Sequence, residues 1–294
     1  ALRTAKARRE VLLAGGAINS PQLLQLSGIG PGALLQHHGI AVVHDLPGVG
    51  ENLQDHCGGR IIYRCTADVW TMNEVYHNWL RRVHHGLQYV LSMKGALMTG
   101  AGPMGLFVRT RPELASPDVQ YQFLAGSSER TGEAMHKFPG CTLVAIPCRP
   151  ESRGWLRITS RDPSKPPAIQ PNYLATQADK DTMVAGLKVS RRVFAAPALA
   201  RYLTEEYLPG PQAKSDDDLL NHVRATAGTT FHQTSTCMMG PGPMAVVDTS
   251  LRVKGMERLR VIDASVMPTV VSGNTNATAI MIGEKGADMI LRAA

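Results

Sequence analysis

Two polar segments in the last quarter of the chain carry residue types that could perform acid–base chemistry. Residues 231–240 place His232 ahead of hydroxyl groups, a thiol and a glycine, and residues 263–276 carry Asn274 among small polar residues. A histidine with an ordinary pKa of about 6.5 can accept a proton near neutral pH. A carboxamide N–H can stabilise negative charge that develops on an oxygen. Taken alone, however, His232 is more often a structural histidine and Asn274 a turn residue.

Other suggestive patterns do not support a site. Residues 28–33 match G-x-G-x-x-A, but a helical pattern precedes them instead of a strand, so we interpret them as a turn between helices. A nucleophile elbow, G-x-S-x-G, is absent. Three histidines share a helical face with Arg81, whose permanent charge argues against a metal site, and we expect none. The five cysteines include no C-x-x-C pair, which favours free thiols in a reducing compartment.

Composition excludes several classes of protein. The 294 residues carry a net charge of +7, but the basic residues are scattered and aromatic residues make up only 5%. A stacking platform for nucleic acid is therefore not expected. The sequence contains no apolar run of about eighteen residues, so we expect no transmembrane segment. The charged stretch at residues 1–10 is not a secretory signal, and we expect a cytoplasmic protein, with peripheral membrane association as the alternative.

Both ends of the chain show the alternation of strand and helix that is typical of α/β domains. Residues 11–17 form an apolar run that ends in glycines, which predicts a buried strand. Ser20 and Pro21 follow as the expected N-cap and first residue of a helix. The other elements expected here are a helix over 33–38, strands over 40–43 and 259–262, and a helix over 278–291.

The middle of the chain has a different pattern, in which strand candidates are separated by loops. Such runs indicate an antiparallel or mixed sheet with helices on one side. The expected strands are 60–65, 119–124, 142–148 and 155–159, and the expected helices are 76–93, 181–194 and one opened by Ser215. We therefore predict an α/β domain made from both ends of the chain, with the middle inserted as a second domain.

Four motifs follow one another over nearly the whole chain: residues 16–30, residues 48–56 (Gly-Val-Gly-Glu-Asn-Leu-Gln-Asp-His), and the two polar segments. Together they resemble the glucose–methanol–choline (GMC) oxidoreductases, most closely the choline dehydrogenase-like branch. The resemblance implies an α/β fold (α+β overall): a partial, Rossmann-like FAD-binding domain at 1–58 and 226–294, and an antiparallel or mixed-sheet substrate domain inserted at 59–225. The family's opening G-x-G-x-x-G unit is not in this sequence, so we expect a missing N-terminal segment.

The resemblance also assigns roles to individual residues. His232 matches the family's catalytic histidine, and Asn274 matches a second position that is His or Asn in different members. Alcohol oxidation removes the hydroxyl proton while a hydride leaves the carbon for flavin N5, so His232 is the expected base and Asn274 the expected donor to the alkoxide. The expected FAD contacts are Ala14 and Gly15 near the adenine portion, Asp263 and Ala264 near the pyrophosphate and ribityl portion, and Thr275 and Asn276 at a helix N-terminus beside the flavin.

Some positions depart from the family pattern or stay open. The family usually shows His-Pro-x-Gly-Thr, whereas Gln233 and Ser235 stand at the proline and glycine positions, so we expect a loop of altered stiffness. Asn52 and His56 are equally compatible with locking a loop and with covering the cofactor. Asn276 is the expected N-cap of the last helix.

The implied function is FAD-dependent oxidation of a primary alcohol, choline-like or another small alcohol, with an unidentified electron acceptor. A hydroxynitrile lyase that keeps FAD as a structural group is one alternative. A non-catalytic, truncated remnant is another. We expect the 294-residue chain by itself to hold FAD poorly and to be inactive.

Overall fold

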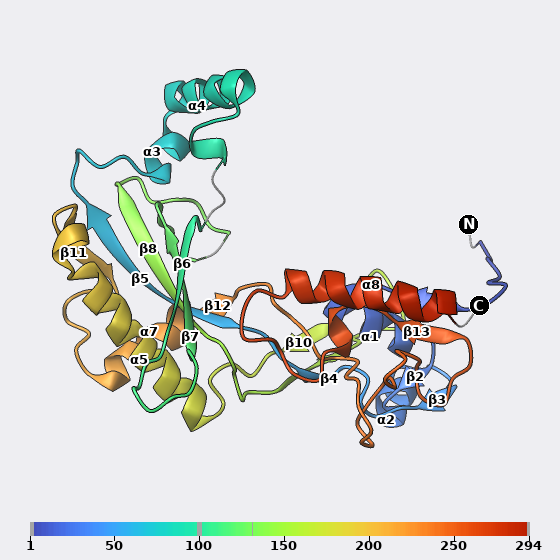
Figure 1. The fold of residues 1–294 in the computed structure, drawn as a ribbon. Helices are drawn as coiled ribbons and strands as arrows, with labels where there is room; N and C mark the ends of the chain where they lie inside the picture. The colour runs from blue at the N-terminus through green and yellow to red at the C-terminus, as the bar shows by residue number, and fades with distance from the viewer. Residues whose placement is uncertain (1–2, 99–101, 131, 293–294) are drawn as a thin grey trace. The chain divides into compact units, whose positions relative to one another are not determined.

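The computed structural model describes residues 3–98, 102–130 and 132–292, which form a mixed α/β structure in two compact units (Figure 1). The first unit comprises Ala1–His56, Arg149–Ala175 and Phe231–Ala294, and the second comprises Cys57–Cys148 and Thr176–Thr230. We expected residues 59–225 to form one inserted domain. Instead, residues 149–175 pack with the two ends of the chain, and the second unit extends to Thr230.

The first unit contains two parallel strands, β1 (Val11–Leu13) and β13 (Leu259–Val261), in register from Val11 opposite Leu259 to Leu13 opposite Val261. The prediction that residues 11–17 form a buried strand is wrong in length and in burial. The strand stops at Leu13, and the side chains of Val11 and Leu12 are 48% and 47% exposed. A parallel strand is buried when both of its faces are covered, and among the described residues β1 pairs with β13 alone.

Helix α1 (Gly16–Leu26) begins earlier than Ser20, so the prediction that Ser20 is its N-cap is wrong, and Pro21 lies inside the helix. The N-terminus of α1 is held from a distance in sequence. The Asp263 carboxylate accepts hydrogen bonds from the Gly16 amide (3.0 Å) and from Ser20 Oγ (2.5 Å). A carboxylate satisfies unpaired amides at a helix N-terminus and interacts favourably with the helix dipole.

The glycine-rich segment after α1 connects it to α2 (Gly32–His37), as expected from the helical pattern on both sides. Within this connection β2 (Ile29–Gly30) pairs in parallel with β3 (His44–Asp45). The strand expected at 40–43 is therefore displaced, because the Gly28 carbonyl accepts from the amides of Val43 (2.8 Å) and His44 (3.1 Å) and starts the pairing there. The 3₁₀ turn η2 (Ala264–Val266) and α8 (Asn276–Arg292) complete the unit.

Buried Gln25 explains why residues 149–175 belong to the first unit. Its side-chain amide donates to the carbonyls of Val49 and Leu156 (both 3.1 Å), and its oxygen accepts from the Ile158 amide (2.9 Å). In the same unit β9 (Gly154–Arg157) lies between β4 (Glu51–Leu53) and β10 (Ala168–Gln170), antiparallel to both. A hydrophobic cluster fills the interior of the unit, with Leu24, Val49, Val246, Val261, Val266 and Ile282 among its members.

The second unit is built on an antiparallel sheet with the strand order β11-β5-β8-β7-β6, and β12 (Gly228–Thr229) also pairs with β5. Three expected strands are confirmed as β5 (Cys57–Cys65), β7 (Val119–Leu124) and β8 (Gly140–Pro147). The strands β6 (Met104–Val108) and β11 (Leu203–Leu208) complete the order.

Helices α5 (Gln177–Phe194) and α7 (Asp216–Thr226) pack on the sheet of the second unit (Figure 1). Ser215 caps α7 in a capping box with Asp218, as its position before the acidic run indicated. The short α6 (Pro197–Ala200) follows α5.

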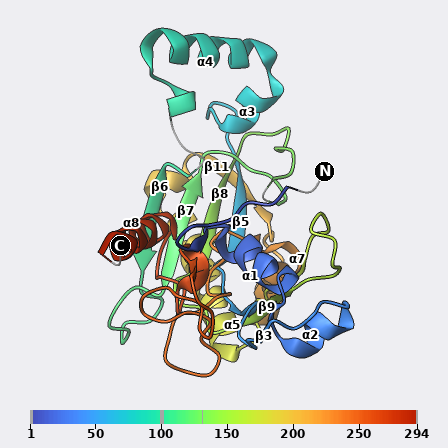
Figure 2. The same ribbon diagram turned by 90° about the vertical axis from the view of Figure 1, so that its right-hand side faces the viewer.

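The long helix expected at 76–93 is two helices, α3 (Met72–His77) and α4 (Trp79–Ser92), because Asn78 is extended and its side chain caps α4. The 3₁₀ turn η1 (Ala96–Met98) follows. None of the α4 side chains is buried, and Figures 1 and 2 show this helix standing apart from the sheet of its unit.

Candidate active site

The two polar segments singled out in the sequence lie side by side in the first unit. The backbone amides of Ser235, Cys237 and Met239 donate to the carbonyls of η2, at Ala264 (3.3 Å), Ser265 (2.9 Å) and Val266 (2.9 Å) respectively. These backbone bonds hold the histidine-bearing loop against the segment that follows β13. A reaction at His232 therefore takes place next to the segment that follows β13.

His232 and Asn274 meet in this region. The Asn274 amide nitrogen lies 3.2 Å from Nε2 of His232, although the two residues are 42 positions apart in sequence. The His232 side chain is buried, whereas Asn274 is exposed. An imidazole nitrogen and an amide N–H that are this close can both form a hydrogen bond with one oxygen atom that lies beside them.

A second histidine contacts the other ring nitrogen of His232. Nδ1 of fully buried His56 lies 3.0 Å from Nδ1 of His232, and the two rings meet edge to face with their centroids 5.1 Å apart. His56 closes the Asn-Leu-Gln-Asp-His run, which is why it attracted attention in the sequence. In the structure His56 contacts Nδ1 of the candidate base His232, and Asn274 contacts Nε2.

Asp55 anchors the loop that carries His232. Its Oδ1 accepts from the His232 amide (2.9 Å), and its Oδ2 accepts from the Gln233 side-chain amide (3.3 Å) and from the Tyr173 hydroxyl. Sequence reasoning missed Asp55 and Tyr173. The run that contains Asp55 offered a signal for it, but Tyr173 is 118 positions away and stands in no recognisable motif.

The backbone of the His232 loop adopts conformations that most side chains avoid. Phe231 and Ser235 have φ angles of 62° and 75°. Ser235 thus takes a left-handed conformation at the position where the glucose–methanol–choline oxidoreductases that this sequence resembles usually have glycine. Glycine adopts this conformation without steric cost. Gln233, at the family's proline position, instead supplies a side-chain donor to Asp55. A side-chain bond to Asp55 holds this loop, and its altered stiffness stays a prediction.

The loop that carries Asn274 is fixed by the same run as His56. The Gln54 side chain donates to the Pro268 carbonyl (3.3 Å) and accepts from the Val270 amide (3.1 Å). Asn52 donates to the Pro268 carbonyl (3.4 Å) and contacts the Met238 sulfur (3.2 Å). Of the two interpretations left open for Asn52, these contacts favour the loop lock.

Burial lowers the pKa of His232 below its ordinary value of 6.5, and the neighbouring His56 lowers it further, while the charge of Asp55 raises it. Burial dominates because a charged imidazolium loses hydration in this environment. His232 is consequently neutral at neutral pH and has a lone pair available to accept a proton.

Two of the residue groups expected to contact a dinucleotide occupy neighbouring strand ends. Ala14 and Gly15 follow β1 and are exposed, and Asp263 and Ala264 follow the parallel strand β13. Ligands of open α/β sheets bind outside the carboxyl ends of parallel strands, so these residues fit part of a dinucleotide site. The Asp263 carboxylate already accepts bonds from α1 on one oxygen and from the Ser265 amide (2.8 Å) on the other. A cofactor contact at Asp263 would therefore use its backbone.

The last group, Thr275 and Asn276, lies at the start of α8, whose first turn holds no acidic residue. The prediction that Asn276 is the N-cap is wrong by one position. The helix begins at Asn276, and the Thr275 carbonyl accepts the first helical bond from Ala279 (2.9 Å). The positive end of the helix dipole lies here and suits the negative edge of a reduced flavin.

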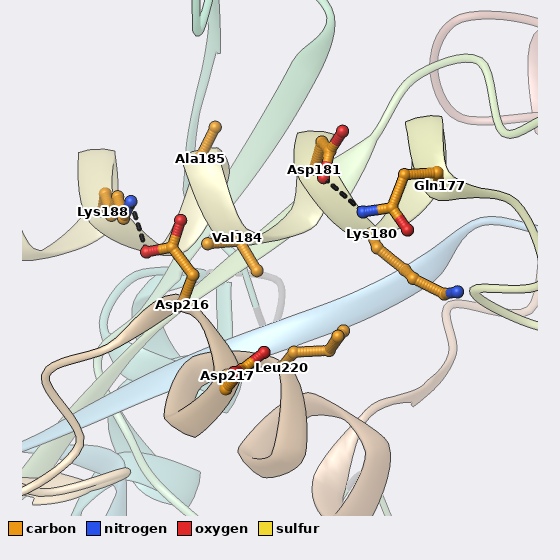
Figure 3. A pocket seen from close by; sticks show the side chains of 9 residues that line it. All are labelled: Gln177, Lys180, Asp181, Val184, Ala185, Lys188, Asp216, Asp217 and Leu220. Carbon is orange, nitrogen blue, oxygen red and sulfur yellow. Dashed lines mark hydrogen bonds and ion pairs between the residues drawn. The ribbon is translucent and has the colours of Figure 1, made fainter.

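Other features of the described residues do not compete with this site. Within the described ranges no group of three or more His, Cys, Asp or Glu side chains could hold a metal ion. None of the helices described is long and apolar enough to cross a membrane. A groove between α5 and α7 contains the Lys188–Asp216 ion pair (2.5 Å) and a Gln177–Asp181 hydrogen bond (2.7 Å) (Figure 3). Its lining offers neither a histidine nor a thiol.

Comparison with known proteins agrees with these features. Two family models, both described as GMC oxidoreductase, match residues 1–58 and 150–283. The alcohol dehydrogenase (acceptor) of Pseudomonas putida is 43% identical over 284 residues, which are 96% of this chain and 51% of that protein. The oxygen-dependent choline dehydrogenase of Serratia proteamaculans (strain 568) is 42% identical over 287 residues, 98% of this chain and 51% of that protein.

A solved structure shares the fold. The formate oxidase of Aspergillus oryzae RIB40, a structure described in terms of FAD modification, superposes with a TM-score of 0.90 at 29% identity, covering 98% of this chain and 55% of that chain. The chain thus spans about half the length of the curated relatives that it matches.

Proposed function

This chain belongs to the GMC oxidoreductases, and on that premise we propose that it carries the proton-accepting half of an FAD-dependent alcohol oxidation site. The observation that carries the proposal is the 3.2 Å approach of the Asn274 amide to Nε2 of buried His232. The names of the similar alcohol and choline dehydrogenases support alcohol oxidation in general.

The chain's own residues account for the fate of the hydroxyl proton. The Asn274 amide N–H faces Nε2 of His232. A substrate hydroxyl placed beside both groups would donate a hydrogen bond to Nε2 and accept one from Asn274. As the O–H bond breaks, Nε2 takes the proton, and Asn274 stabilises the negative charge that develops on the oxygen.

FAD supplies, when bound, the acceptor for the two electrons that leave the carbon with its hydrogen. The residues proposed to hold it are Ala14 and Gly15 at the end of β1, Ala264 and the backbone of Asp263 at the end of β13, and Thr275 and Asn276 at the start of α8. Asp263 links these positions, because its side chain fixes the start of α1 while its backbone follows β13.

Anaerobic reduction of the flavin tests the proposal. Because the 294-residue chain alone is expected to hold FAD poorly, the test uses the protein with the expected N-terminal segment included and loaded with FAD. It is mixed with a series of primary alcohols, choline among them, and the visible absorbance of oxidised flavin is followed. We expect at least one alcohol to bleach the wild-type flavin, and the His232→Ala variant to bleach about 10²–10⁴ times more slowly. His38→Ala, a change of a half-buried histidine at the C-terminal end of α2, serves as the control. A stably loaded protein whose flavin no alcohol reduces contradicts the proposal, and cyanide release from a hydroxynitrile with the flavin still oxidised indicates a lyase.

A further inference from the structure

We propose that His56 is a positioning residue that holds neutral His232 as the tautomer protonated on Nδ1, so that the Nε2 lone pair faces Asn274. The basis is the pair of contacts on the two ring nitrogens of His232, one to each neighbour. The inference rests on the proposed function only for its kinetic consequence, because the tautomer itself is a property of the folded chain.

The donors and acceptors that contact the two ring nitrogens of His232 determine its tautomer. An amide NH₂ group is a donor without an acceptor, so Nε2 of His232, 3.2 Å from the Asn274 nitrogen, must be the acceptor there. A neutral imidazole has one donor and one acceptor nitrogen, so the remaining nitrogen, Nδ1, carries the hydrogen. Its partner 3.0 Å away is Nδ1 of His56, which therefore accepts. His56 in turn carries its own hydrogen on Nε2.

Burial protects the contact between His56 and His232 from replacement by water. His56 is fully buried and His232 is only 8% exposed, so bulk water does not easily replace the acceptor that His56 provides. The backbone of His232 is also held, because Asp55 accepts its amide hydrogen at 2.9 Å. With the backbone and one ring nitrogen anchored, the ring is fixed in orientation and the lone pair of Nε2 is directed towards Asn274.

The arrangement also suits the protonated state. When Nε2 takes a proton, the Nδ1–H bond to His56 persists, and His56 can remain neutral as the acceptor. Among the titratable groups nearby, Asp55 accepts the backbone amide hydrogen of His232, and Tyr173 donates to Asp55. The base–orienter relationship is the general one in which a second group sets the tautomer of a catalytic imidazole.

Nitrogen NMR of the 294-residue chain tests the tautomer without any flavin chemistry. With ring nitrogens labelled and the His232 signals identified by their loss in His232→Gln, wild-type protein above the His232 pKa should show hydrogen on Nδ1 and a bare Nε2. His56→Leu, which removes this acceptor, should shift His232 towards hydrogen on Nε2, because the exposed Asn274 amide can turn and accept that hydrogen with its oxygen. His56→Asn, whose side-chain oxygen can accept, should retain the wild-type tautomer, and His38→Leu should leave it unchanged. Hydrogen on Nε2 in the wild type, or an unchanged tautomer in a folded His56→Leu, would overturn the proposal.

Flavin reduction in the FAD-loaded protein provides the second readout. For an alcohol that reduces the wild-type flavin, His56→Leu should lower the limiting rate of reduction at least about tenfold, and His56→Asn should restore most of it. The concentration of alcohol needed for half the limiting rate should change little, since His56 acts through the base. Equal rates in wild type and His56→Leu contradict the proposed role. A wild type that shows the expected tautomer but whose flavin no alcohol reduces instead contradicts the proposed function alone.

Discussion

The Thr236 hydroxyl donates a 2.7 Å hydrogen bond to the backbone carbonyl of Ala17 in the first turn of α1. In an uninterrupted helix this carbonyl would accept from the amide four residues later, but that residue is Pro21, which has no N–H. Both Thr236 and Ala17 are buried, so the carbonyl would otherwise lack a partner away from water. The Thr236 hydroxyl thus replaces the backbone hydrogen bond that Pro21 cannot donate within α1.

Replacing Thr236 with Val should therefore destabilise the first unit by about 1–3 kcal/mol, because a buried carbonyl loses its donor. Urea unfolding followed by circular dichroism measures the change. Pro21→Ala restores a backbone N–H at the right position, so Thr236→Val should cost less in that background. The exposed turn residue Thr249 is the matched control. An equal cost in both backgrounds would show that the hydroxyl does not substitute for the missing amide.

Arg260, buried beside β1, depends on Glu10. Its Nε donates to Glu10 Oε2 at 2.7 Å, and the two side chains are 4% and 18% exposed. Glu10→Gln leaves the guanidinium buried without a counter-charge and should lower the free energy of unfolding by about 3 kcal/mol. Asp288→Asn breaks exposed ion pairs on α8 and should cost about 0.5 kcal/mol or less. Similar losses in the two variants would contradict the importance of burial.

Asn274 should be needed for the chemical step more than for the fold, because the residue is exposed and its amide contacts the candidate base His232. In the FAD-loaded protein, Asn274→Leu removes the donor to the developing alkoxide and should slow flavin reduction about 10²–10³-fold. Asn274→His keeps a donor and should be clearly faster than Asn274→Leu. The melting temperatures of both variants should stay near the wild-type value. Reduction by Asn274→Leu at the wild-type rate would remove Asn274 from the mechanism.

The lowered pKa of His232 predicts the direction of the pH dependence. Flavin reduction should fall as His232 becomes protonated, with a midpoint below the ordinary 6.5. Asp55→Asn removes the charge that raises this pKa and should move the midpoint to lower pH. Because the unfolded chain binds the proton more readily, His232 should also make folding less favourable as pH falls from 6.5 through the folded pKa. Rates measured across this range check the prediction, and a midpoint above 6.5 contradicts it.

In the second unit, Tyr63 should ionise at unusually high pH. Burial, followed by the charge and hydrogen bond of Glu206, raises its pKa to about 12. Glu206→Gln removes that charge but leaves Arg191, which lowers the pKa, so ionisation should shift towards 10. Ultraviolet titration, compared with Tyr63→Phe to identify the signal, measures the shift. The exposed neighbour Glu205 provides the control, and a shift of equal size in Glu205→Gln would mean that the effect is not local.

The sequence was sufficient for the features that depend on short-range patterns. Apolar runs and turn residues located β5, β7 and β8, and the four ordered motifs identified His232 and Asn274 as candidates. Hydrophobic patterning acts over a few residues and can be read without knowing what packs against it. The same local rule failed for Pro21, which is a good first residue of a helix but here lies inside one that begins at Gly16.

Only the tertiary structure decided which distant groups act together. His56 and His232 are 176 residues apart, and Tyr173 is linked to the His232 backbone through Asp55, from a segment that we had expected in the other domain. That segment belongs to the first unit because Gln25 and β4 bind it there, a long-range pairing that leaves no local trace in sequence. Chain packing, more than residue type, therefore turns His232 from a plausible histidine into one with a held backbone, a paired ring and a lowered pKa.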